Sequence, residues 1–141
     1  LVHKKGFDAL LDLPETAQSL IAPLPVAYDP ELPGYRSMLE MMGGMGHASE
    51  NLPKAQAIKD ATMAHFILEN WEPGKLFIHF NGAYHSNNYE GIYWYLKKQN
   101  PDLSILTITT VEQDNIEELS EENQAIADYT ICIPKNMTKT Y

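Results

Sequence analysis

The sequence predicts an α/β fold with three layers, α/β/α, and a mainly parallel sheet built from βαβ units and preceded by an N-terminal helical segment. Residues 75–80 form a short apolar run that is typical of a buried strand, and an amphipathic segment follows at 89–98. Residues 104–111 are rich in β-branched side chains and predict a second strand. A strand, a helix and a strand in this order favour parallel pairing with a right-handed crossover.

The first part of the chain is weakly patterned and predicts short helices joined by a connector. Apolar residues near Phe7 and the segment after Pro14 favour one or two helical turns each. Prolines recur between residues 22 and 34 and exclude a long helix there. We therefore expect residues 1–52 to form a helical insert or connector. Residues 53–141 are expected to form an α/β half-domain that belongs to a larger single domain.

Residues 35–47 predict a methionine-rich helix. One helical face carries Met38, Met41, Met42 and Met45. Thioethers suit soft metals and haem iron, and Tyr35 and His47 at the two ends of the segment are residue types that serve as axial haem ligands. The alternative is a plain helix whose methionines pack on a core or on another subunit.

Residues 52–71 predict the clearest helix, with Pro53 in its first turn. Asp60 falls inside the apolar stripe of this helix, and Gln56 falls at the edge of the stripe. A buried carboxylate needs a partner. Asp60 and Gln56 are therefore expected either to brace nearby polar side chains or a ligand, or to bind loop N–H groups and tie the helix to the sheet.

The C-terminal part predicts a further helix and a third strand. Asp114 and Glu117 have the spacing of a capping box, which favours a helix that extends to about Ala127. The β-branched run at 129–134 then predicts a strand.

Composition excludes several classes of partner. The chain has 141 residues, about one domain, and a net charge of −9 without a basic patch, so nucleic acid and anionic membrane surfaces are not expected as partners. The single cysteine, Cys132, gives no internal disulfide and is expected to be a small buried hydrophobe. No apolar run approaches the roughly 20 residues of a membrane span.

Polar side chains follow the first predicted strand, where open α/β sheets bind their ligands. His79, Asn81 and His85 lie within seven residues of one another. His79 and His85 are compatible with two ligands of one metal ion, with Asp60 as a third. The alternative is a core histidine at position 79 and a surface loop histidine at position 85. The sequence has no nucleophile elbow, phosphate loop, dinucleotide fingerprint or paired-cysteine motif.

Two segments resemble a known family. Residues 54–64 read Lys-Ala-Gln-Ala-Ile-Lys-Asp-Ala-Thr-Met-Ala and resemble the A-Q-x-x-x-D-x-x-M-A helix of the ChaN-like haem-binding family of iron-regulated lipoproteins. Residues 79–85 read His-Phe-Asn-Gly-Ala-Tyr-His and resemble the G-x-x-H motif that ends a strand in that family. The resemblance covers about residues 54–110 well and the rest of the chain loosely.

The resemblance implies a parallel α/β fold with an inserted helical segment, and haem held at a dimer interface for iron acquisition outside the cytoplasm. The family holds its haem through a tyrosine of the insert, for which Tyr35 is the nearest candidate. The wider superfamily includes metal-dependent hydrolases, the Tiki/TraB-like proteases and erythromycin-esterase-like enzymes, which carry a G-E-x-H motif near the chain start. This sequence has no such motif, and family members are longer, so we expect this chain to be the C-terminal part of a larger protein.

The leading hypothesis from the sequence is a haem-binding protein of bacterial haem uptake, periplasmic or associated with the outer membrane, and either a homodimer or part of a longer chain. The residues expected to contact the porphyrin are Tyr35, Met38, Met42 and His47. The residues expected to form a polar pocket are Gln56, Asp60, His79, Asn81 and His85. The alternative is a hydrolase that depends on a divalent metal, in which His85 is a metal ligand or general base and Asp60 orients it. A third possibility is an interaction domain whose pocket is vestigial.

Overall fold

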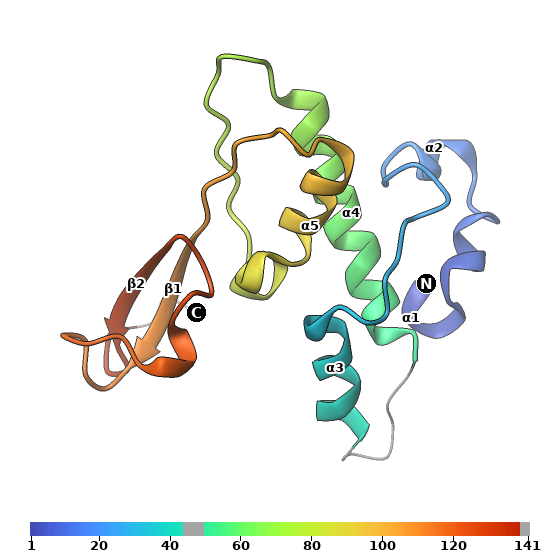
Figure 1. The fold of residues 1–141 in the computed structure, drawn as a ribbon. Coiled ribbons are helices and arrows are strands. Elements are labelled where there is room, and N and C mark those ends of the chain that lie inside the picture. The colour runs from blue at the N-terminus through green and yellow to red at the C-terminus, as the bar shows by residue number, and fades with distance from the viewer. Residues whose placement is uncertain (44–49, 139–141) are drawn as a thin grey trace.

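Helices dominate the computed structural model, which describes residues 1–43 and 50–138. The N-terminal part contains the short elements α1 (Val2–Lys5), η1 (Phe7–Leu10) and α2 (Glu15–Gln18), followed by α3 (Pro33–Gly43). The long helix α4 (Leu52–Asn70) runs through the middle of the molecule, with the N-terminal segments on one side and α5 on the other (Figure 1). The short helices near Phe7 and after Pro14 agree with the sequence prediction.

Helix α4 is the central packing element, and its bounds agree with the helix predicted at 52–71. Pro53 lies in its first turn, where the missing N–H has no helical partner to lose. Ala57 and Ala64 are completely buried, and small side chains at these positions let neighbouring segments approach the helix closely. One apolar cluster lies between α4, α5 and nearby segments and contains Ala22, Ala61, Ala64, Ile67, Ile92, Tyr95, Leu96 and Leu103. A second cluster joins Val2 and Leu10 to Ile58.

Helix α5 (Ile92–Gln99) packs against α4 and begins later than the predicted start at residue 89. Two short turns come first, η2 (Ala83–His85) and η3 (Asn87–Tyr89). Asn88 and Tyr89 both have a φ of 59°, a left-handed conformation that does not continue into a right-handed helix. The helix therefore starts only after Gly91.

The described sheet has two parallel strands, β1 (Ile108–Gln113) and β2 (Tyr129–Pro134). Ile108 pairs with Tyr129 and Gln113 pairs with Pro134. The parallel direction of the sheet and the position of β2 agree with the sequence prediction, but the βαβ unit predicted over residues 75–111 is not formed, and β1 begins four residues after the predicted start at 104. A mixture of helices and two parallel strands is compatible with an α/β class, and the three-layered arrangement stays a prediction.

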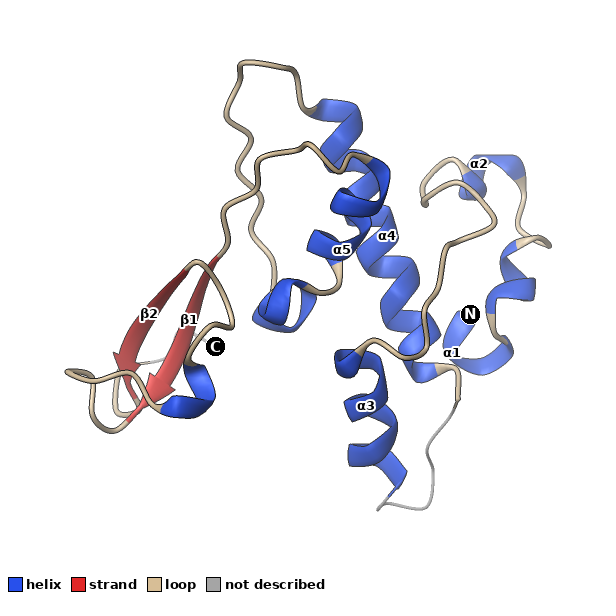
Figure 2. Ribbon diagram, in the orientation of Figure 1, coloured by secondary structure: helices blue, strands red, loops and turns tan. Residues whose placement is uncertain are grey.

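The strand predicted at 75–80 is absent from the described structure, so this prediction was wrong. The segment is an extended loop (Figure 2) in which Leu76 is 87% exposed and Phe80 is 90% exposed. An apolar run becomes a strand only when another strand supplies hydrogen bonds along its edge. No described segment makes such a ladder with residues 75–80. The segment therefore exposes large apolar side chains to solvent, as a surface that binds another polypeptide segment would.

The helix predicted from Asp114 to Ala127 is replaced by a loop with one short turn, η4 (Glu121–Asn123). Lys135 Nζ donates to Asp114 Oδ2 at 2.7 Å, so the expected capping carboxylate binds a distant lysine. The Glu117 N–H instead donates to Asn115 Oδ1 at 3.0 Å, which forms a local turn that competes with a helix.

Two smaller predictions concern single features. Among the helices of residues 1–43 and 50–138, none combines the length and the apolar character that a bilayer span requires. Cys132 is half-buried on β2, whereas the sequence predicted a buried position.

Candidate functional site

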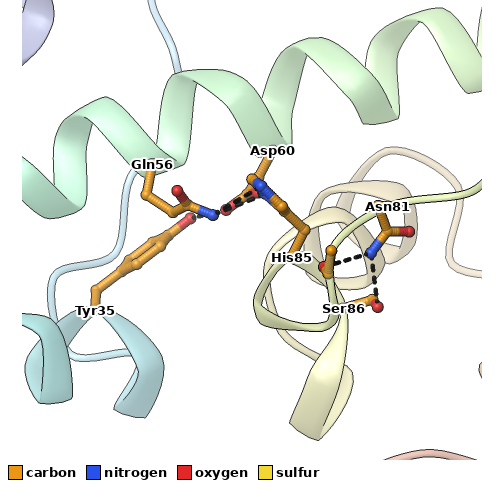
Figure 3. A network of polar contacts seen from close by, with 7 residues as sticks. Tyr35, Gln56, Asp60, Asn81, His85 and Ser86 are labelled. Atoms are coloured by element: carbon orange, nitrogen blue, oxygen red, sulfur yellow. Dashed lines mark hydrogen bonds and ion pairs between the residues drawn. The ribbon is translucent and has the colours of Figure 1, made fainter. Parts of the chain in front are cut away.

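Three segments that are distant in the sequence meet at the carboxylate of Asp60 (Figure 3). Asp60 projects from α4 and is 1% exposed. His85 reaches it from η2, with Nδ1 at 2.5 Å from Asp60 Oδ1. Tyr35 reaches it from α3, and its hydroxyl donates to Asp60 Oδ2 at 3.1 Å. Each oxygen of the buried carboxylate thus has a partner, as burial of such a group requires.

Gln56 lies one helical turn before Asp60 and completes this group. Its Nε2 lies 2.7 Å from His85 Nδ1 and 3.5 Å from His85 Nε2. Residues four apart lie on the same helical face, which is why both side chains reach one imidazole. We refer to Tyr35, Gln56, Asp60 and His85 as the Asp60 network.

Burial dominates the electrostatics of the network. Desolvation raises the pKa of Asp60, and the hydrogen bonds and charges of its partners, His85 first, oppose that rise only in part. Burial and the neighbouring Asp60 raise the pKa of Tyr35 far above its usual range, so its hydroxyl keeps its proton and acts as a donor. Tyr35 is only 4% exposed. The network therefore keeps in place a carboxylate whose burial is energetically unfavourable, through hydrogen bonds from Tyr35 and His85.

The short contact to Asp60 defines the orientation of the His85 imidazole. An ionised carboxylate only accepts hydrogen bonds, so its contact with Nδ1 favours the tautomer that carries the proton on Nδ1 and the lone pair on Nε2. The His85 side chain is 23% exposed. Histidines that bind metals commonly donate their other ring N–H to a carboxylate in this way. The pair thus presents one basic nitrogen of fixed direction.

Two glycines allow the segments around the network to come close. A Cβ on Gly91 would clash with the carbonyl oxygen of His85 and would lie 3.2 Å from Asp60 Oδ2, and φ at this position is +53°. The Gly34 N–H at the start of α3 donates to Glu90 Oε2 at 2.7 Å, and the Tyr84 hydroxyl donates to the Gly34 carbonyl at 3.0 Å. These contacts fix α3 against the loop that carries His85.

The sequence did not single out Glu90 and Tyr84 for this purpose. The positive φ at Gly91 was not predicted either. A glycine directly before a helix is the sequence signal that could have indicated it.

The other predicted pocket residues lie apart from the carboxylate. Asn81 donates to the Gly82 carbonyl at 2.9 Å and to Ser86 Oγ at 3.0 Å, so it braces its own loop (Figure 3). His79 is exposed, and partial desolvation and then the charge of nearby His85 lower its pKa. The structure therefore brings Gln56, Asp60 and His85 together, and it places His79 and Asn81 outside their hydrogen-bond network.

The predicted methionine face is described only in part. Met38 is half-buried and Met41 is exposed on α3. The side chain of Met42 and the residues Met45 and His47 lie outside the described parts of the chain.

An open apolar cleft of about 450 Å³ runs along α4 beside the network. Its walls are formed by Ile21, Ile58, Lys59, Thr62, Met63 and His85. This volume lies within the usual range of ligand pockets, which are mostly apolar with a few polar groups that orient the ligand. The cleft was not predicted, because it forms only where Ile21 from the connector and His85 from η2 meet the side of α4 that carries Ile58 and Thr62.

A metal centre made of protein side chains finds little support. Over residues 1–43 and 50–138, no three or more histidine, cysteine, aspartate or glutamate side chains come together as a metal site would require. The predicted pair His79 and His85 therefore lacks the further ligands of a divalent metal site.

The fold and the site define a helix-rich α/β domain that buries an aspartate–histidine pair beside an apolar cleft. A sequence model of the family described as "Haem-binding uptake, Tiki superfamily, ChaN" matches residues 1–96. The chain therefore belongs to the ChaN-like haem-binding family, as its sequence motifs indicated. The match ends within α5, so β1 and β2 lie beyond it. Searches of curated proteins and of solved structures gave no match.

Proposed function

We propose that this protein binds haem as a component of bacterial haem and iron uptake. The observation that carries the proposal is the Asp60–His85 pair, whose imidazole borders an apolar cleft in a chain of the ChaN-like family. A porphyrin needs apolar walls for its faces and a directed donor for its iron, and these are the features that meet here.

The sequence hypothesis also assigns porphyrin contacts to Tyr35, Met38 and Met42, which belong to α3, and to His47, which lies outside the described residues, and we keep this as part of the proposal. Half-buried Met38 and exposed Met41 offer apolar surface on α3. His79 and Asn81 would stand at the polar side of the site, on the loop that carries His85.

A titration of the protein with hemin tests the proposed function. We expect a saturable change in the Soret band with a defined stoichiometry, because a built site binds a fixed number of porphyrins. Met38→Ala is expected to weaken binding, with Met137→Ala on the distant C-terminal segment as the control. Absence of any saturable Soret change would contradict the proposal.

We also propose that this domain completes its sheet with a second polypeptide segment, in a homodimer or in a longer chain. Exposed apolar side chains at Leu76, Ile78 and Phe80 and on β1 and β2 at Ile108 and Ile131 support this. Sedimentation of the protein with and without hemin tests the dimer, and a monomer in both states would exclude it. A periplasmic or outer-membrane location belongs to the same proposal, and cell fractionation tests it.

A metal-dependent hydrolase is the second candidate function, favoured by one observation. A carboxylate that orients a histidine is also the arrangement of a general base. Metal analysis and hydrolysis assays with an ester and a peptide substrate, compared between the wild type and His85→Ala, test this candidate. Bound divalent metal together with turnover that His85→Ala abolishes would favour the hydrolase over the haem-binding protein.

A further inference from the structure

The two strands β1 and β2 form a sheet with one covered face and one open face. Thr109 and Gln113 lie on the covered face and are 4% and 8% exposed. Gln113 Nε2 donates to the Glu118 carbonyl at 2.6 Å, so the loop at 114–128 lies on this side. The open face carries the alternate side chains of both strands, namely Ile108, Thr110, Glu112, Tyr129, Ile131 and Ile133.

Three large side chains of the open face are exposed to solvent. Ile108 is 60% exposed, Tyr129 is 62% exposed and Ile131 is 52% exposed. Parallel sheets occur almost only with both faces covered, usually by helices. The strands here stand apart from α4 and α5 (Figure 1), and within residues 1–43 and 50–138 no layer covers these three side chains. The open face is therefore a surface of the kind that another helix covers.

The carboxyl end of the same sheet is acidic. A cleft of about 530 Å³ opens there, and we call it the acidic cleft. The charged residues of its lining are five carboxylates and one ammonium, from Glu112, Asp114, Glu118, Glu121, Glu122 and Lys135. Glu112 also belongs to the open face, so the two surfaces adjoin.

The chain itself provides an example of a basic side chain in the acidic cleft. Lys135 Nζ donates to Asp114 Oδ2 at 2.7 Å. This hydrogen bond, and then the charges of Asp114, Glu122 and Glu112, raise the pKa of Lys135. A further cation brought to this end of the sheet would meet the same carboxylates.

Charge distinguishes the possible partners of the open face. The chain carries a net charge of −9, which opposes the approach of a second copy and of an anionic lipid surface. The same charge attracts a basic polypeptide and accelerates its association. Each strand has six residues and spans about 20 Å, which a helix of about 14 residues matches in length.

We propose that the open face binds a basic amphipathic helix of another protein. The apolar side of that helix packs on Ile108, Tyr129 and Ile131, and basic side chains at one of its ends enter the acidic cleft. This interaction is independent of the haem site, because the family match ends within α5 and both strands lie beyond it. Strands added at the edges of the sheet would leave this face open, so completion of the sheet and binding of the helix are compatible.

Two synthetic helical peptides of about 14 residues test the inference. Both have one leucine face, and the lysines in the last turn of the first are replaced by glutamines in the second. Fluorescence anisotropy of the labelled peptides measures their affinity. We expect the lysine peptide to bind the wild type at least tenfold more tightly than the glutamine peptide, and less tightly as the salt concentration rises.

Three variants locate the site. Ile131→Thr keeps a β-branched residue in the strand and is expected to weaken binding of the lysine peptide about fivefold, through lost apolar contact. Combined Glu121→Lys and Glu122→Lys is expected to weaken it tenfold or more. Leu20→Thr is the matched control, because Leu20 is 70% exposed on the N-terminal part, and its affinity should equal that of the wild type. Amide chemical shifts confirm that each variant is folded, and in the wild type the lysine peptide should move those of β1 and β2.

Several results would overturn the inference. These are no binding of the lysine peptide, equal affinity for the two peptides, or amide shifts confined to α4 and its cleft. Shifts of β1 and β2 that depend on protein concentration without peptide would assign the face to a second copy. Binding to phosphatidylglycerol vesicles that Ile131→Thr abolishes would assign it to a membrane. Failure of the protein to bind hemin would contradict the proposed function alone, because the peptide measurements contain no haem.

Discussion

Asp60 and His85 lie 25 positions apart in the sequence, and their Oδ1 and Nδ1 atoms lie 2.5 Å apart in the structure. The pair joins the central helix to the loop before α5. Tyr35 extends this connection to α3 through the second carboxylate oxygen. One buried side chain thus holds together the three segments that form the candidate site, and several consequences can be measured.

Asp60→Asn is expected to change the pH dependence of stability. Desolvation raises the pKa of Asp60 in the folded protein, so the stability that this group contributes is present below its unfolded pKa of about 3.8 and is lost as the pH rises through the folded pKa. Asparagine does not titrate. The wild type should therefore lose stability relative to Asp60→Asn as the pH rises from about 4 to about 7. The free energy of unfolding of Asp60→Asn minus that of the wild type should become more positive over this range.

Urea denaturation at both pH values measures this difference. Glu69→Gln removes the exposed partner of His65 on the same helix and is the control, which we expect to change the free energy of unfolding little at either pH. A relative stability of Asp60→Asn that falls as the pH rises would show that the carboxylate is stabilised, not penalised, by its surroundings.

Tyr35→Phe is expected to destabilise the fold by about 1–3 kcal/mol, because a buried carboxylate oxygen loses its hydrogen-bond donor. The phenyl ring can still stack on Tyr28, so the loss reports the hydroxyl. Tyr84→Phe removes an exposed hydroxyl that donates to the Gly34 carbonyl, and it should cost less than about 1 kcal/mol. Equal effects of the two variants in chemical denaturation would contradict the role of Tyr35 as an anchor of Asp60.

Gly91→Ala and Gly74→Ala separate backbone strain from close approach. Both glycines have positive φ, +53° and +81°, but a Cβ at Gly74 would meet no atom within 4 Å, whereas at Gly91 it would strike the His85 carbonyl. Gly74→Ala should cost about 1–2 kcal/mol, from φ alone. Gly91→Ala adds a clash and should cost about 2–5 kcal/mol in total. Thermal or urea unfolding distinguishes these values, and similar losses would mean that the loop moves away from α5 without difficulty.

The exposed apolar segment at 75–80 is expected to lack protected amides in the isolated chain. No backbone ladder holds residues 76–80, whereas residues 57–67 donate within α4. Amide hydrogen exchange should therefore be fast at 76–80 and slow at 57–67. Slow exchange at 76–80 would indicate that the segment is paired in solution, and its loss on dilution would point to pairing between copies of the chain.

The parts of this structure that the sequence predicted depend on local periodicity. The stripe of α4 placed Asp60 on a buried face, and the structure finds it buried, because a helix repeats every 3.6 residues whatever its surroundings. The β-branched run of β2 was equally readable. The same periodicity predicted Gln56 at the edge of the stripe, and in the structure its side chain lies beside His85.

The parts that the sequence did not predict depend on distant partners. The run at 75–80 has strand composition but no neighbouring strand, and pairing is a property of the whole sheet. The capping box at Asp114 was lost to Lys135, which lies 21 residues away. Ile21 from the connector forms part of the wall of the cleft along α4, and no spacing in the sequence predicts that contact.

The protonation of the His85 ring tests the central claim most directly. Nitrogen NMR of the histidine side chains, at a pH where the rings are neutral, distinguishes the two tautomers of each imidazole. The structure predicts a proton on Nδ1 of His85 in the hydrogen bond to Asp60, a bare Nε2, and loss of this preference in Asp60→Asn. A proton on Nε2 in the wild type, or a tautomer that Asp60→Asn leaves unchanged, would contradict the account.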